Sequence, residues 1–297
     1  MSGDARVGAR LATVHDEDGT AFPTLVLYPS RDTERPERVG PYVLDVAMDG
    51  QVDDGAFPLV VVSHGSGGSH LAYRTLGAHL ARRGFVVALP AHPRNNRDDD
   101  TLAGTHTILA DRPRQLRRVI DWAYADATFG PHLLPDAVAL VGHSLGAYTA
   151  LAVAGGHPTA GPHETPDGQP RPVPVVPDPR VKALVLLAPA TPWLMAPGAL
   201  RDVHVPILMR SAGRDPYTPA WHAEVVTRGL PSGTAVDHQV VPDAGHFSFL
   251  SPFPPAMTGP SFLPAQDPPG FDRVAYHEVL YAEIEAFLRR VIDGRDS

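Results

Sequence analysis

Short apolar runs without polar alternation recur through the middle of the chain. Strands of this kind are typical of a parallel sheet, because helices cover both faces of such a sheet. The segments between the runs carry apolar residues at helical spacing, as in residues 70–83 and 116–125. The alternation predicts an α/β fold with a mostly parallel central sheet and helices on both faces. The runs are residues 59–63, 85–89, 137–141, 181–187 and 207–210.

The beginning and the end of the chain follow other patterns. Residues 9–14 and 22–27 flank the turn-like segment 16–19, which predicts an antiparallel hairpin at one edge of the sheet. Residues 271–292 predict a closing amphipathic helix. With 297 residues, of which 43% are hydrophobic, the chain has enough apolar surface for a sizeable core. We therefore expect a single α/β domain over residues 1–297.

Two excursions rich in proline and glycine interrupt the alternation of strands and helices. They span residues 155–180 and 251–270. Loops of this length are commonly either functional or disordered. The second follows a candidate catalytic histidine directly, so we expect either a pocket wall or a plain surface loop there.

Composition excludes several classes of function. The net charge of −8 argues against a nucleic-acid partner, which requires a basic face. The absence of cysteine excludes disulfides, thiolate catalysis and cysteine-ligated zinc. No metal site is expected, since HExxH is absent and the acidic run 98–100 is typical of a solvated loop. No apolar run approaches the roughly 20 residues of a membrane span, and the N-terminus has no signal-peptide core, so a cytoplasmic location without a membrane partner is the default expectation.

A serine stands between two glycines at the end of one apolar run, in Gly142-His143-Ser144-Leu145-Gly146. This spacing is typical of the nucleophile elbow, a sharp strand-to-helix turn that exposes the serine hydroxyl above the sheet. The flanking residues fit, because a strand-like run precedes Ser144 and a segment rich in alanine and leucine follows it. The motif predicts that Ser144 is a nucleophile; the alternative is a small serine in a tight turn.

A serine nucleophile needs a histidine base and an acid that orients the histidine. In the chain order serine, acid, histidine, Asp215 follows the run 207–210 and His246 follows a strand-like segment that ends at residue 241. Both lie after strand ends, which form the ligand side of an open α/β sheet. Asp243 is a rival acid, and Asp215 before a proline is also a common way to begin a turn.

The loop after the first central run predicts an oxyanion hole. Residues 63–68 read Ser63-His64-Gly65-Ser66-Gly67-Gly68, which allows backbone N–H groups to approach a developing negative charge. We expect the donors to be the amides of Ser66 and Leu145, with His64 bracing the loop. A phosphate-binding loop is excluded, because the Lys and Ser/Thr of that motif do not follow and GxGxxG is absent.

Taken together, residues 61–68, 80–93, 245–250 and 269–273 resemble the bacterial group of predicted dienelactone hydrolases related to platelet-activating-factor acetylhydrolase. The resemblance implies an α/β-hydrolase fold and cofactor-free cleavage of carboxylic esters or lactones. Residues 187–192 lack the carboxylate that the mammalian acetylhydrolases carry there, so Asp215 takes the acid role and phospholipid specificity is not implied. Dienelactone hydrolases proper use a cysteine nucleophile, which this chain does not contain.

The sequence thus predicts a serine hydrolase that acts on a small-molecule carboxylic ester of small to medium size through an acyl-enzyme on Ser144. A lactonase, an acyltransferase or a non-catalytic ligand-binding relative are the alternatives. No oligomeric state is predicted. Side chains near the motifs are expected to line the pocket, with core or lid packing as the alternative for each. They are Tyr73, Asn95, Trp193, Tyr217, Phe247 and Phe249.

Overall fold

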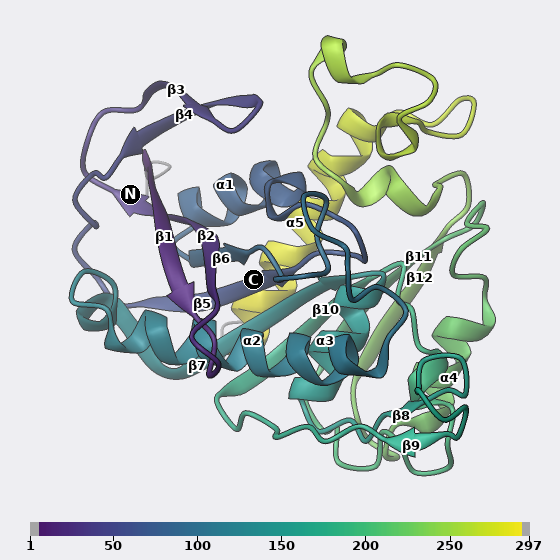
Figure 1. Ribbon diagram of the computed structural model, residues 1–297. Helices are drawn as coiled ribbons and strands as arrows, with labels where there is room; N and C mark the ends of the chain where they lie inside the picture. Colours follow the sequence, from purple (N-terminus) through teal and green to yellow (C-terminus); the bar gives the residue numbers. More distant parts are fainter. Residues whose placement is uncertain (1–5, 293–297) are drawn as a thin grey trace.

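A ten-stranded sheet forms the centre of the computed structural model, which describes residues 6–292 (Figure 1). Its strand order is β12-β11-β10-β7-β5-β6-β2-β1-β4-β3. The strands from β12 to β6 in this order pair in parallel, and the sequence prediction of a mostly parallel sheet is confirmed. The strands are β1 Arg6–His15, β2 Ala21–Ser30, β3 Arg35–Val39, β4 Tyr42–Met48, β5 Phe57–Ser63, β6 Val86–Pro90, β7 Leu133–His143, β10 Val181–Leu187, β11 Ile207–Ala212 and β12 Val236–Val241.

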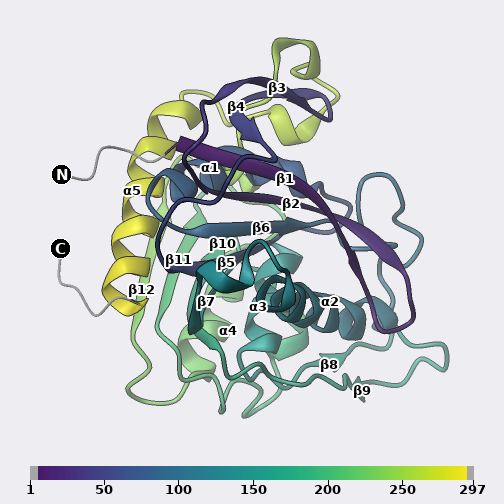
Figure 2. The ribbon, with the colours of Figure 1, turned by 90° about the vertical axis from the view of Figure 1, so that its left-hand side faces the viewer.

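Helices cover both faces of this sheet, because successive side chains of the central strands point to opposite sides. In β5, Leu59 and Val61 belong to the core shared with α2 and α3, whereas Val60 and Val62 belong to the core shared with α1 and α5. Figure 2 shows α5 on one side of the sheet and α2 with α3 on the other. The helices are α1 Arg74–Arg82, α2 His106–Ala125, α3 Leu145–Val153, α4 Trp221–Gly229 and α5 Arg273–Ile292.

Short 3-10 turns and one small ladder complete the described chain. The turns are η1 His70–Tyr73, η2 Gly130–His132, η3 Pro192–Leu194, η4 His246–Phe249, η5 Pro255–Met257 and η6 Leu263–Ala265. Strands β8 Thr159–Ala160 and β9 Arg171–Pro172 pair within the first proline-rich excursion. Over residues 6–292, no helix is both long and apolar enough to cross a membrane.

The predicted N-terminal hairpin is present as β1 and β2, which pair antiparallel from Arg6 with Ser30 to His15 with Ala21. A second hairpin, β3 with β4, follows it and was not predicted. Helix α2 is longer than predicted and begins at His106, with Pro113 inside it. The sheet therefore extends further at its N-terminal edge than the apolar runs indicated.

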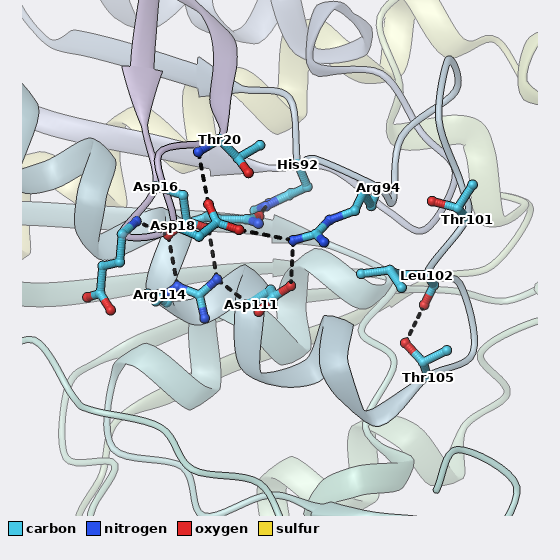
Figure 3. A network of polar contacts seen from close by, with 12 residues as sticks. Asp16, Asp18, Thr20, His92, Arg94, Thr101, Leu102, Thr105, Asp111 and Arg114 are labelled. Carbon is cyan, nitrogen blue, oxygen red and sulfur yellow. Dashed lines mark hydrogen bonds and ion pairs between the residues drawn. The ribbon is translucent and has the colours of Figure 1, made fainter. Parts of the chain in front are cut away.

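Alternating charges tie the turn of the β1–β2 hairpin to the loop after β6 and to α2. Arg94 pairs with Asp18 and Asp111, at 3.4 and 3.6 Å, and Arg114 pairs with Asp111 at 2.9 Å. Figure 3 shows Arg94 between the two carboxylates. Arg114 also makes two hydrogen bonds to Asp16, at 2.8 and 2.9 Å. The side chain of Asp16 is almost fully buried, so its pair with Arg114 joins the hairpin turn to α2 beneath the surface.

Candidate active site

A cavity of about 660 Å³ opens at the carboxyl edge of the parallel strands. Ser144 follows β7, His246 follows β12, and Ser66 follows β5, and all three residues line this cavity. The topology thus brings residues that are far apart in the sequence to one site, as expected for the ligand side of a parallel sheet. Six aromatic side chains form much of the remaining lining: Tyr42, Tyr73, Tyr217, Phe247, Phe253 and Phe262.

Ser144 occupies a strained turn between β7 and α3. Its backbone has φ +54° and ψ −120°, a combination that residues with a Cβ atom rarely adopt. The turn is held by hydrogen bonds from the Ser144 amide to the Leu187 oxygen, at 3.0 Å, and from the Ala190 amide to the Ser144 oxygen, at 3.1 Å. This conformation is the one that a nucleophile elbow imposes on its serine.

The two glycines of the motif are required by close approach of backbone. A Cβ on Gly146 would collide with the main-chain oxygen of Ser63, at the end of the neighbouring strand β5. A Cβ on Gly142 would collide with the main-chain oxygen of Gly146. The elbow can therefore pack against the sheet only with glycine at both positions.

His246 and Asp215 form a buried pair beside the elbow. The imidazole Nδ1 donates a hydrogen bond to Asp215 Oδ2 at 2.7 Å, so in a neutral imidazole Nε2 is the nitrogen that can accept a proton. Asp215 also accepts hydrogen bonds from the Tyr217 and Thr218 amides and from the Thr218 hydroxyl, at 2.7, 2.9 and 2.6 Å. Burial raises the pKa of Asp215, but the hydrogen bonds from His246 and Thr218 outweigh it and lower the pKa to about 2. The carboxylate is therefore an anion at neutral pH.

Asp243, the rival acid, does not take part in this pair. It forms an ion pair with Arg214 at 2.5 Å, and both side chains are at least half exposed. Asp215 is thus the carboxylate that the structure places on the histidine.

The Ser144 hydroxyl makes no hydrogen bond to any residue in the described part of the chain, and it shares the cavity wall with His246. Free enzymes often show such loose geometry, and the bond between nucleophile and base tightens when substrate binds. The arrangement leaves the hydroxyl accessible from the cavity.

The glycine-rich loop after β5 lies directly against the elbow. A Cβ on Gly65 would be 3.3 Å from the Cβ of Ser144. Neither the Ser66 amide nor the Leu145 amide donates a hydrogen bond to a residue in the range 6–292, so both donors are available to a bound group. His64 is fully buried behind the loop, where its Nδ1 donates to the Gly65 oxygen at 2.7 Å and its Nε2 accepts from the His92 amide at 3.0 Å. This is the position from which a histidine can brace the loop.

The structure separates the six expected pocket residues into two groups. Tyr73, Tyr217 and Phe247 line the cavity. Tyr217 is 53% exposed and lies at the mouth, whereas Tyr73 is buried at 2% exposure. The aromatic rings of Tyr217 and Phe247 are 5.6 Å apart, so they form a continuous patch beside His246.

Asn95, Trp193 and Phe249 do not line this cavity, and their assignment is corrected. Asn95 is fully buried, and its side-chain amide donates to the Ser66 hydroxyl at 3.0 Å from behind the loop. Trp193 packs on Tyr148, with ring centres 4.9 Å apart. Phe249 is 2% exposed and belongs to the core beneath the histidine loop. Trp193 and Phe249 thus pack against other side chains, whereas Asn95 belongs to a buried hydrogen-bond network.

The second proline-rich excursion forms a wall of the cavity. Phe253, Phe262, Leu263 and Pro264 all face into it, so the wall, rather than a plain surface loop, is what the structure shows. No sequence motif indicated these residues, nor Tyr42, whose ring centre lies 6.4 Å from that of Phe253. No spacing relates Tyr42 to this excursion, which lies some two hundred residues further along the chain.

The sheet topology and the strained turn at Ser144 are those of the α/β-hydrolase fold. Comparisons with known proteins agree with this assignment of the fold. Residues 37–115 match the family described as platelet-activating factor acetylhydrolase, isoform II. A ferulic acid esterase from Streptomyces cinnamoneus has a similar structure, with a TM-score of 0.75 and 19% identity over 100% of this chain and 93% of that chain.

Among curated proteins, a bis(hydroxyethyl) terephthalate hydrolase from Streptomyces coelicolor is 27% identical over 200 residues, which cover 66% of this chain and 52% of that protein. The chain thus spans about half the length of this relative. All three matches are named as hydrolases or esterases, and the resemblance expected from the motifs is confirmed at the level of the α/β-hydrolase fold.

Proposed function

We propose that this protein is a serine esterase that hydrolyses carboxylic esters of small to medium size through an acyl-enzyme on Ser144. The observation that carries the proposal is the buried hydrogen bond between Asp215 and His246, at 2.7 Å, because His246 lines the same cavity as the strained serine. The hydrolases and esterases that the chain resembles support the same class of reaction.

In the first half of the reaction, His246 Nε2 takes the proton of Ser144 Oγ while this oxygen attacks the ester carbonyl carbon. The carbonyl oxygen becomes negatively charged and is stabilised by the amides of Ser66 and Leu145. Asp215 holds the imidazole in the required tautomer and stabilises its positive charge. His246 then returns the proton to the departing alcohol as the carbon–oxygen bond breaks.

In the second half, His246 takes a proton from water, and the resulting hydroxide attacks the acyl group on Ser144. The same two amides stabilise the second oxyanion. Collapse of this intermediate releases the carboxylic acid, and the proton returns to Ser144 through His246. Each residue thus acts in both halves, and the cycle needs no further reactant besides water.

The cavity suits an apolar acyl group. Its volume of about 660 Å³ lies within the range of small-molecule sites. Six Tyr and Phe rings line it, and among residues 6–292 its lining includes Arg97 but no carboxylate. An acyl group with a ring would pack against these faces. The relative named for a terephthalate ester supports this choice of substrate class.

Labelling with a fluorophosphonate, followed by intact mass measurement and peptide mapping, tests the proposal. We expect one adduct, on Ser144, and none on the Ser144→Ala variant. Nitrophenyl esters of increasing acyl size would then show turnover that is lost in the same variant. A folded protein that forms no adduct and hydrolyses none of these esters would overturn the proposal.

A further inference from the structure

Arg112, on the inner face of α2, is a fully buried cation without a direct carboxylate partner among the described residues. Its four hydrogen-bond acceptors are all neutral. Nε donates to Thr149 Oγ1 at 3.1 Å, Nη1 to Asn95 Oδ1 at 2.6 Å, and Nη2 to Ser63 Oγ at 3.2 Å and to the His64 main-chain oxygen. Burial lowers the pKa of Arg112 to about 9, so the group remains charged at neutral pH. One cation thus connects the end of β5, the loop after β6 and helix α3.

Two of the side chains that accept from Arg112 also donate hydrogen bonds to residues of the proposed oxyanion hole. Asn95, which accepts from Arg112 through its oxygen, donates through its nitrogen to the Ser66 hydroxyl at 3.0 Å. Thr149, which accepts from Arg112, donates to the main-chain oxygen of Leu145 at 2.9 Å. Each arm contains one bridging side chain, and the two arms end on Ser66 and Leu145, the residues whose amides are the proposed oxyanion donors.

The direct bond to His64 completes the arrangement. Arg112 holds the main-chain oxygen of His64, and through Asn95 it holds the side chain of Ser66 two residues later. The short stretch between them contains Gly65, which has no side chain of its own to restrict it. Fixing both ends therefore restricts the orientation of the intervening peptide groups, including the amide of Ser66.

We propose that Arg112 is a positioning residue that sets the separation of the Ser66 and Leu145 amides through the arms Asn95 and Thr149. The inference rests on the proposed function, since it assigns Arg112 to the same site. The guanidinium is suited to this task because its donors form a rigid planar fork, which holds several acceptors at fixed angles.

The size of the effect follows from what an oxyanion hole contributes. Removal of one donor in such a site lowers kcat by about 100- to 1000-fold, and a misplacement of about 1 Å costs about 100-fold. A misplaced donor is less damaging than a missing one, so we expect Arg112→Met to lower kcat by about 10- to 100-fold. KM should change little, because the interaction develops with the charge of the transition state.

The test measures kcat and KM of the wild-type protein and of the variants with nitrophenyl butyrate as substrate. Each rate is divided by the concentration of active sites, which is determined by labelling with a fluorophosphonate to completion. Asn95→Ala and Thr149→Val each break one arm, and each should lower kcat per site by about tenfold. Thr149→Ser restores the hydroxyl and should recover most of the loss caused by Thr149→Val. These three variants test the inference even if the Arg112→Met protein does not fold.

Arg180→Met is the matched control. Arg180 is a partly buried arginine, paired with Asp178 at 2.6 Å, but it precedes β10 and so lies at the amino ends of the parallel strands, away from the cavity. Its loss should lower the melting temperature and leave kcat per site unchanged. A lower melting temperature with unchanged kcat per site in the Asn95 and Thr149 variants would show that the network is merely structural and would overturn the inference.

Double variants test separately whether Arg112 acts through Thr149. If Arg112 acts through Thr149, then Thr149→Val should lower kcat by less than about twofold in the Arg112→Met protein, because the arm is already broken. Full additivity would contradict the inference. A wild-type protein that does not label at Ser144 would instead overturn the proposed function, so the two failures are distinguishable.

Discussion

The imidazole of His143 donates its Nε2–H to the main-chain oxygen of His246 at 2.8 Å, with the two rings 4.8 Å apart. The residue directly before the elbow serine therefore holds the loop that carries the proposed base. Burial and the neighbouring His246 lower the pKa of His143 to about 3, so His143 stays neutral and keeps this bond at neutral and mildly acidic pH.

Replacement of His143 should misplace His246. We expect His143→Leu, which has no donor, to lower kcat by about tenfold, whereas His143→Gln, which keeps one, should lose less. Steady-state kinetics on nitrophenyl esters decides the comparison. Equal losses in both variants would show that the ring's packing, and not its hydrogen bond, matters.

Asp215 should be the acid on which turnover depends. Asp215→Asn preserves the shape of the side chain but not its charge, and in comparable triads such a change lowers kcat by about ten-thousand-fold. Asp243→Asn is the matched control, because this carboxylate pairs with Arg214 at the surface. A greater loss of kcat from the Asp243 variant would transfer the acid role to that residue.

Gly146 should tolerate no side chain. An added Cβ would meet the Ser63 backbone, which cannot move away without distorting β5, so we expect Gly146→Ala to lower the free energy of unfolding by about 3 kcal/mol. Gly259→Ala is the control, since nothing lies within 4 Å of the Cβ it would add. Denaturant melts of both proteins measure the difference, and similar stabilities would contradict the close approach at the elbow.

The wall formed by the second excursion should discriminate between acyl groups. Phe262 lines the cavity and packs edge-on against Phe253, with ring centres 5.1 Å apart. Phe262→Ala should lower kcat/KM for nitrophenyl benzoate by about tenfold and affect nitrophenyl acetate far less, because only the larger acyl group reaches the wall. Phe271 lies outside the cavity, so Phe271→Ala is the control and should leave kcat/KM for both esters unchanged. An equal loss for both esters would contradict a wall that contacts the acyl group.

Asp16 should stabilise the fold above about pH 4. Burial raises the pKa of Asp16, but the hydrogen bonds from Arg114 and the Glu17 amide outweigh this, and the net pKa lies below 3.8. A carboxyl group with a lowered pKa contributes stability that is fully present above its unfolded value and lost as the pH falls through the folded one. We expect Asp16→Asn to cost about 2 kcal/mol at pH 7. Denaturant melts should show this difference shrinking below pH 4; a constant difference would mean that the charge of Asp16 is not responsible.

The central sheet could be predicted from the sequence because its strands are buried on both faces. Every residue of β6, for example, is buried, which is why residues 85–89 show no polar alternation. The first half of α2 escaped prediction for the opposite reason. Asp111, Arg112 and Gln115 are buried polar residues on the inner face of that helix, and they interrupt the apolar periodicity on which the prediction depended.

The motifs indicated the elbow and the loops around it, because backbone strain and close approach restrict which residues can stand there. Proximity in sequence was a poor guide to the cavity lining. Phe247 faces the cavity, while Phe249, two residues later in the same 3-10 turn, is buried in the core. Tyr42 and Phe253 meet only through the fold, and no local pattern could relate them.

Contacts outside the cavity anchor the excursion over residues 251–270 at both ends: Thr75 donates to the Ser251 hydroxyl at 2.8 Å, and Ser248 donates to Asp267 at 2.6 Å. Arg273, the first residue of α5, binds Asp267 at 2.9 Å and the main-chain oxygens of Leu250 and Pro264 at 3.4 and 3.0 Å. The segment between these attachments contributes to the lining but includes neither the elbow, nor the His246–Asp215 pair, nor the glycine-rich loop. Changes confined to this one segment can therefore alter substrate preference, while the residues proposed to cleave the ester keep their positions.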